Sequence, residues 1–208
     1  MADKLGNHIM KTNILILSAI IPGILVLTSC QELPKEAIDK ASAAVENAKT
    51  SGAEMYDAEN YQLLEDSLKN AMTSVDAESG KFFKDYQNAI KNLEGVSSFA
   101  TTVTTNVEVK KEEVKAKVTA TINEVKALIA ENQQLITEAP KGKEGTTALL
   151  AMKGELSVLE STLTETNTLL EQGQLQPSLE KATVAKDKAT TLNTELKDIT
   201  SKYKSAKK

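Results

Sequence analysis

An apolar three-four spacing runs almost without interruption from Pro34 to the C-terminus, and it constrains the fold more than any other feature. Residues three and four positions apart lie on one face of an α-helix, so this spacing predicts helices that each carry one apolar face. The pattern includes a stretch of residues 81–137 that contains no proline and only one glycine, Gly95. The sequence therefore predicts an all-α protein.

Prolines, glycines and capping residues divide the pattern into five expected helices. We expect them to run from Pro34 to Gly52, from Asp57 to Gly80, from Lys81 to about Thr137, from Thr146 or Thr147 to Gly173, and from Pro177 onward. One part of the third helix is ambiguous, because residues 96–109 are rich in valine and threonine and would also fit a strand. The segment that follows has a helical pattern, so we expect a helix that is bent or frayed there.

The second half of the chain echoes the first in its order of helix, turn, helix, glycine and helix. We therefore expect elongated antiparallel helical bundles, in which two spectrin-like three-helix units share the long central helix. The first unit would cover residues 34–108 and the second residues 109–208. In the alternative layout the third helix breaks near residues 101–109 and the chain folds into one compact helical bundle.

Leucines of the fourth expected helix recur every seven residues, as in a coiled-coil seam. They are Leu149, Leu156, Leu163 and Leu170, with Met152, Leu159 and Thr166 at the core positions between them. Short turns favour packing within one chain over a homo-oligomeric coiled coil, and the oligomeric state stays open.

The first 29 residues have the features of a bacterial lipoprotein signal peptide, whose natural start could be Met10. Residues 14–27 form an apolar run, which suits a secretory signal but is too short to span a membrane. The run ends on Leu27, Thr28, Ser29 and Cys30, a pattern that resembles a lipobox, where a signal peptidase cuts before a lipid-modified cysteine.

Cys30 is the only cysteine in the chain, and its sulfur would take the diacylglyceryl group. Residues 30–33 would then form a lipidated tether, with acyl chains such as palmitate holding the protein on the membrane. Gln31 is not aspartate, so outer-membrane sorting is expected. The alternative is an ordinary secretory signal followed by an unrelated cysteine.

The residue types that remain after cleavage disfavour several functions. The single histidine is His8, inside the leader, and all basic residues are lysines. The mature chain thus offers no histidine for acid–base catalysis or zinc binding and no arginine for nucleic-acid recognition. It shows no phosphate-binding loop or nucleophile elbow. We expect a protein that is not an enzyme, with no catalytic residues, no cofactor, no metal and no nucleic-acid partner.

Charge is unevenly distributed along the chain. Residues 31–80 contain 11 acidic residues and 4 lysines, whereas residues 181–208 contain 8 lysines and 3 acidic residues. The lysines would either cover solvated helix faces or form a basic tail that docks on an anionic surface.

Residues 34–100 resemble the domain-of-unknown-function family 4398. The resemblance is carried by Ala37-Ile38, Ala41, Ala44, Ala48, Gly52-Ala53, Tyr56, Leu64, Leu68, Ala71, Tyr86 and Ala89. Members of that family are alanine-rich, helical, lipid-anchored envelope proteins of bacteria. The resemblance therefore implies an envelope location and a helical fold, and it implies no activity. After Tyr56 the family often has Ala-Pro, where this chain has Asp57-Ala58.

Together these patterns predict a non-enzymatic, lipid-anchored bacterial envelope lipoprotein that acts as a scaffold, a spacer or a partner-binding surface. Its partner would be a protein or the cell wall. One alternative is a surface-exposed lipoprotein that binds host or environmental macromolecules. Another is linkage of the outer membrane to peptidoglycan through Lys208, because residues 201–208 resemble the lysine-ended tail of Braun-type lipoproteins. The sequence leaves open whether the protein faces the periplasm or the cell surface.

Overall fold

The computed structural model describes residues 32–139 and 143–206, and all regular structure within them is helical. The all-α prediction is therefore confirmed. The helices are α1 (Lys35–Thr50), α2 (Ala53–Tyr56), α3 (Ala58–Ser79), α4 (Gln87–Glu138), α5 (Lys143–Glu171) and α6 (Leu175–Ala206).

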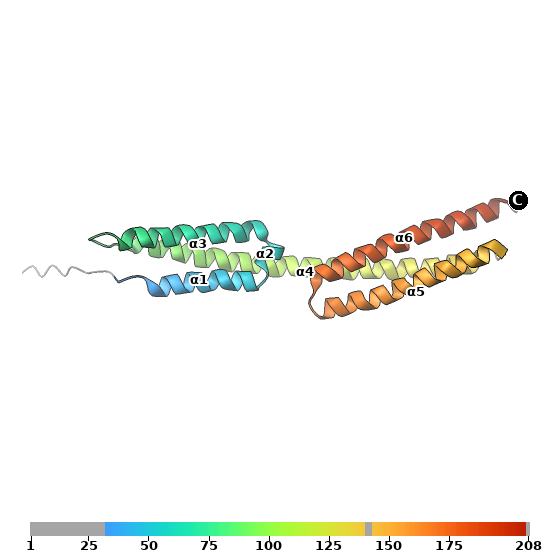
Figure 1. Cartoon of the computed structure of the whole chain (residues 1–208), viewed down its shortest axis with the longest axis horizontal. Coiled ribbons are helices and arrows are strands. Elements are labelled where there is room, and N and C mark those ends of the chain that lie inside the picture. Colours follow the sequence, from blue (N-terminus) through green and yellow to red (C-terminus); the bar gives the residue numbers. More distant parts are fainter. Residues whose placement is uncertain (1–31, 140–142, 207–208) are drawn as a thin grey trace, which may run out of the picture.

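Helix α4 runs the length of the molecule. Its 52 residues span about 78 Å at the usual helical rise. Helices α1 and α3 pack along its first half, and α5 and α6 pack along its second half (Figure 1). The alternative of one compact bundle, with a break near residues 101–109, is wrong, because α4 is continuous through that segment.

The valine- and threonine-rich part of α4 remains helical because both kinds of side chain are satisfied there. Val103 and Val107 lie one helical turn apart and are fully buried in the first core. The threonine hydroxyls donate hydrogen bonds to the carbonyl oxygens four residues earlier, as Thr104 does to Ala100 at 2.9 Å. A strand in this part of the chain would lose both arrangements.

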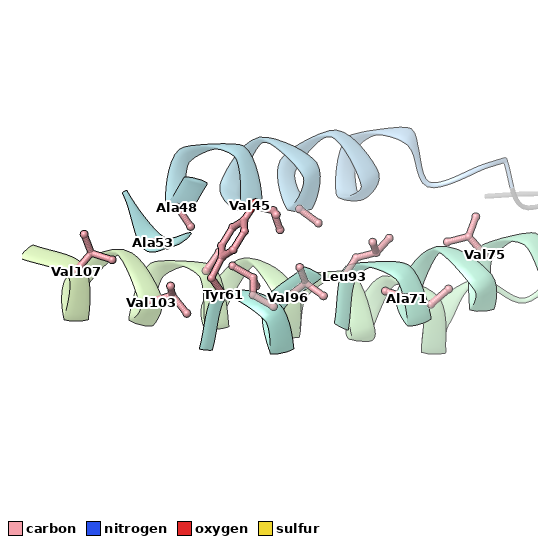
Figure 2. Close-up of a cluster of buried hydrophobic side chains, with 14 of the residues drawn as sticks. Val45, Ala48, Ala53, Tyr61, Ala71, Val75, Leu93, Val96, Val103 and Val107 are labelled. Carbon is pink, nitrogen blue, oxygen red and sulfur yellow. The ribbon is translucent and has the colours of Figure 1, made fainter. Parts of the chain in front are cut away.

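The first core lies between α1, α3 and the front half of α4. Figure 2 shows buried side chains of these helices meeting in one layer. Many are alanines, which let the helix axes approach closely. The buried members are Ala41, Val45, Ala48, Ala53, Tyr61, Leu64, Ala71, Val75, Tyr86, Ala89, Leu93, Val96, Ala100, Val103 and Val107.

The second core lies between the back half of α4 and helices α5 and α6. The heptad positions of α5 point inward as expected, and Leu156 and Leu163 are at most 5% exposed. The buried members are Val118, Ile122, Val125, Ile129, Ile136, Ala139, Leu149, Leu156, Leu159, Leu163, Ala182, Ala185, Ala189, Leu192 and Leu196.

A segment of α4, residues 108–117, separates the two cores, and none of its residues is buried. It corresponds to about 15 Å along the helix axis. Ion pairs along its surface join Glu108 to Lys111 at 2.9 Å and Glu112 to Lys115 at 3.7 Å. We call residues 108–117 the bare segment. The unit boundary expected between residues 108 and 109 falls inside it.

Several helix ends differ from the expected ones. Helix α4 begins at Gln87 rather than at residue 81, and its N-cap residue is the buried Tyr86. The carboxylate of the preceding residue, Asp85, accepts a hydrogen bond from the Gln87 amide at 3.0 Å. The short helix α2 was not expected, and it follows Gly52, whose φ of 96° is left-handed.

The two C-terminal helices also begin earlier than expected. Helix α5 begins at Lys143, so the predicted caps Thr146 and Thr147 lie inside it. Helix α6 begins at Leu175, and Pro177 occupies its first turn, where a missing amide hydrogen is tolerated.

Candidate functional site

The predicted attachment residues lie outside the described residues. These are the lipobox residues Leu27, Thr28 and Ser29, the lipidation candidate Cys30, and the peptidoglycan-attachment candidate Lys208. The described chain starts at Glu32, two residues after Cys30, and α1 begins three residues later. None of the described helices combines the length and apolarity needed to cross a bilayer.

The end of the molecule where α1 begins also carries the loop between α3 and α4 (Figure 1). The start of α1 lies beside the first turns of α4, since Leu33 and Ala37 line the same surface hollow as Ile90 and Glu94. We call this end, formed by residues 32–37 and 80–90, the N-terminal tip.

The loop at the N-terminal tip exposes two adjacent phenylalanines. Phe82 is 91% exposed and Phe83 is 77% exposed. Their rings are in edge-to-face contact, with centroids 5.0 Å apart. Tyr86, which is 2% exposed, and the hydrogen bond from the Gln87 amide to the Asp85 carboxylate hold the end of the loop in place. The loop is thus an ordered support for an apolar surface.

A buried carboxylate lies at the corner between α2 and α3. Asp57 occupies the expected N-cap position, but its side chain makes no capping hydrogen bond. Its oxygens instead accept hydrogen bonds from Lys110 Nζ at 2.5 Å and from Asn60 Nδ2 at 3.0 Å. Burial alone would raise the pKa of Asp57, but the hydrogen bonds from Lys110 and Asn60 outweigh it and lower the pKa.

The Asp57–Lys110 ion pair ties the α2–α3 corner to the start of the bare segment. The neighbouring Lys111 lies 5.9 Å from the centroid of the Tyr56 ring, a cation–π contact on the same corner. These contacts restrain the first turn of the bare segment, and nearer its other end the partly buried Val114 packs against the second core.

The second core contains a polar layer that sequence reasoning missed. Asn132 of α4 is fully buried and donates a hydrogen bond from Nδ2 to the carbonyl oxygen of Ala189 at 3.0 Å. Its Oδ1 accepts a hydrogen bond from Asn193 Nδ2 of α6 at 2.7 Å. Asn132 lies between Ile129 and Ile136 in the apolar register, and this spacing was the signal that could have revealed it.

A second buried polar contact joins α5 to α6. Ser178 is fully buried, and its hydroxyl donates to the carbonyl oxygen of Thr166 at 2.9 Å. Thr166, which was expected in the core, is fully buried as well. Every buried side-chain nitrogen and oxygen among the described residues has a hydrogen-bond partner.

A groove of about 790 Å³ runs between α5 and α6. Val158 on α5 and Val184 on α6 line it and are 60% and 53% exposed. Charged side chains, including Glu155, Lys188 and Glu195, alternate with them. We call this hollow the α5–α6 groove. The groove therefore combines exposed apolar side chains with charged ones.

Several lysines of α6 form ion pairs within the second bundle. Lys197 contacts Glu131 at 2.8 Å, and its hydrogen bond lowers the pKa of that carboxyl group. Lys186 contacts Glu124, and Lys181 contacts Glu165 at 2.5 Å. A substantial part of the positive charge at the C-terminal end therefore offsets acidic residues of α4 and α5.

The geometry defines an all-α protein in which two helical cores share one long helix, with an apolar tip at one end and a groove in the unit at the other end. The described residues hold no group of three or more histidine, cysteine, aspartate or glutamate side chains arranged to bind a metal ion. Comparison with protein-family models, with curated proteins and with solved structures finds no match to the chain. The resemblance of residues 34–100 to family 4398 therefore stays a prediction.

Proposed function

We propose that this chain is a non-enzymatic, lipid-anchored envelope protein whose helical rod acts as a spacer that holds a partner-binding surface away from the membrane. The observation that carries the proposal is that the two ends of the rod differ. The described chain begins at the N-terminal tip, two residues after the lipidation candidate Cys30, and the α5–α6 groove lies in the unit built on the other half of α4.

The length of α4 supports the spacer role. Glu124 lies level with the groove, because its ion-pair partner Lys186 is flanked by the lining residues Ala185 and Asp187. It lies 37 positions beyond Gln87 on α4, which corresponds to about 56 Å along the helix axis. A protein anchored at Cys30 would thus present the groove roughly that far from the bilayer when the rod stands upright.

The lipid anchor is tested by replacing Cys30. The Cys30→Ala variant should move from the detergent-rich phase to the aqueous phase in phase partitioning, because no thiol remains to accept the diacylglyceryl group. The matched control is Ser29→Ala, which keeps a small residue before the cysteine and should remain in the detergent phase. Intact-mass spectrometry of the purified wild-type chain should show the acyl groups. An unacylated Cys30 would refute the anchor.

The partner-binding role is tested at the groove. Val158→Glu and Val184→Glu introduce charge onto its exposed apolar side chains, and they should abolish crosslinking of the protein to its envelope partner in intact cells. Leu150→Glu is the control, because Leu150 is 70% exposed on the same helix but does not line the groove. Unchanged crosslinking in the groove variants would refute this role.

The groove would also suit the alternative function, in which the protein faces the cell surface and binds external macromolecules. Protease treatment of intact cells separates the two orientations. Digestion of the described helices without opening the outer membrane supports the surface role, whereas protection until that membrane is opened supports the periplasmic spacer.

A further inference from the structure

We propose that the α3–α4 loop is a second membrane contact, in which Phe82 and Phe83 insert into the phospholipid interface beside the lipid on Cys30. This inference rests on the proposed lipid anchor and deepens it. A single flexible tether lets a rod lie or tumble at any angle. A tether combined with an inserted loop holds the N-terminal tip against the bilayer and restricts the orientation of α4.

The exposure of the two phenylalanines is the first observation behind this inference. The chain has three phenylalanines and no tryptophan. Phe99 packs against the first core, whereas Phe82 and Phe83 are the most exposed large apolar side chains among the described residues. Phenylalanine is among the apolar side chains with which interfacial protein segments enter the boundary between headgroups and acyl chains.

The position of the loop is the second observation. Glu32 lies two positions after Cys30, so the anchor lies within about 7 Å of the start of the described chain. Leu33, which is 42% exposed, follows immediately, and the chain then runs beside the first turns of α4. A lipid on Cys30 would therefore bring the whole N-terminal tip to the headgroup region, including the loop.

The local charges identify lipid insertion, rather than binding to an anionic headgroup, as the driving force. Lys81 forms an ion pair with Glu78 at 2.6 Å, and Lys84 is offset by Asp85 within the same loop. With the charges balanced, attraction to anionic lipid contributes little, and burial of the two rings dominates. We therefore expect contact with neutral and anionic membranes alike, and little effect of salt.

The test uses the leader-free chain from Cys30, which retains every described helix. Its sole thiol is coupled to a phospholipid in vesicles, so the test does not depend on acylation in cells. Because the chain lacks tryptophan, Phe82→Trp gives a single fluorescent probe in the loop. Thr137→Trp is the matched control, since residue 137 is exposed and lies 50 residues beyond Gln87 on α4, about 75 Å away.

The expected result is that the emission of the Phe82→Trp variant shifts to shorter wavelength and is quenched by brominated acyl chains, equally in neutral and anionic vesicles. The Thr137→Trp variant should show neither effect. The inference would be overturned if the emission of the Phe82→Trp variant is not quenched and has the same wavelength as that of the Thr137→Trp control. A shift of the loop probe that depends on protein concentration without vesicles would also overturn it, because a second copy or another protein surface would then cover the loop.

A second measurement gives the magnitude. When Cys30 carries only one acyl chain, membrane binding is marginal and responds to small changes in buried apolar surface. Phe82→Ser together with Phe83→Ser should then weaken vesicle partitioning by roughly tenfold to hundredfold. Val109→Ser with Leu150→Ser removes two exposed apolar side chains that lie outside both the loop and the groove, and it should leave partitioning unchanged. Equal partitioning of both double variants would overturn the inference. Absence of acyl groups in cells would instead refute the proposed anchor.

Discussion

Replacing Asn132 with alanine should destabilise the second bundle by about 2–4 kcal/mol. The side chain is fully buried and makes one hydrogen bond to Ala189 and one to Asn193. Each bond contributes about 0.5–1.5 kcal/mol in net terms, and a buried donor left without its partner costs about 1–3 kcal/mol. The donor left behind is the Asn193 amide, which is only 6% exposed and keeps only its hydrogen bond to the Glu131 carboxylate.

Urea unfolding followed by circular dichroism measures this loss. The matched control is Asn123→Ala, because Asn123 lies on the exposed face of the same helix and its replacement should change stability by less than about 0.5 kcal/mol. Tyrosine fluorescence provides an internal comparison. Three of the four tyrosines, Tyr56, Tyr61 and Tyr86, lie in the first bundle, so the transition that they report should move little. If the two alanine variants unfold at the same urea concentration, the polar layer contributes nothing and the reasoning is wrong.

A double replacement separates the hydrogen bonds from packing. Asn132→Leu alone leaves the Asn193 amide without its buried acceptor, whereas adding Asn193→Leu removes both polar groups and buries apolar surface. The double variant should therefore be more stable than either single variant. Polar core pairs of this kind fix the register of helices at a cost in stability, so we expect the double variant to lose its unique α4–α6 alignment. A double variant less stable than both singles would contradict this account.

Other sites of the first bundle give further expected outcomes. Lys110→Ala should lower the free energy of unfolding by about 1–3 kcal/mol at neutral pH, because it leaves the Asp57 carboxylate buried without a cation. The partial exposure of Lys110 keeps the loss in this range. The pKa of Asp57 is lowered in the folded state, so its carboxylate stabilises the fold above the ordinary pKa of 3.8, and this stabilisation is lost as the pH falls through the folded pKa. Urea unfolding at neutral and acidic pH should show this loss of stability in the wild-type chain. The Asp57→Asn variant should not show it. The pKa of Tyr61 is raised to about 12, mainly by burial and also by the hydrogen bond to Glu65. The contribution of the neutral tyrosine to the stability of the fold is therefore complete below pH 10 and is lost as the pH rises through 12. Ultraviolet titration should show this late ionisation, and Tyr61→Phe should remove it. Gly52→Ala should lower stability by about 1–2 kcal/mol in thermal melts, because φ is 96° and the new Cβ would lie 3.3 Å from the Tyr56 ring. Gly95→Ala, with open space around an exposed helical position, should instead raise it by about 0.5–1 kcal/mol.

Much of the fold was predictable because helical periodicity is a local property. The apolar faces read from the sequence at Leu64, Val96 and Leu156 are buried in the structure. Errors fell at helix ends, where long-range packing decides. The start of α4 depends on burial of Tyr86 beside the first core, and the carboxylate of Asp57 binds a lysine 53 residues away instead of capping its own helix.

The candidate site was predictable only in part. The lipobox pattern is readable from four consecutive residues, although those residues lie outside the described part of the chain. The polar layer was missed because asparagine is not counted in an apolar pattern, although Asn132 keeps the register. The exposed loop was missed because two adjacent phenylalanines are normally expected in a core.

The sequence by itself determined the helical class, because a repeat of three and four residues matches the 3.6-residue turn and requires no knowledge of partners. It also determined which face of each helix avoids water. Only the tertiary structure decided which faces meet, since several helices carry equivalent apolar stripes and the choice depends on contacts between distant residues. That choice produced two separate cores on α4, left residues 108–117 bare between them, and placed Phe82 and Phe83 at the same end as the start of α1.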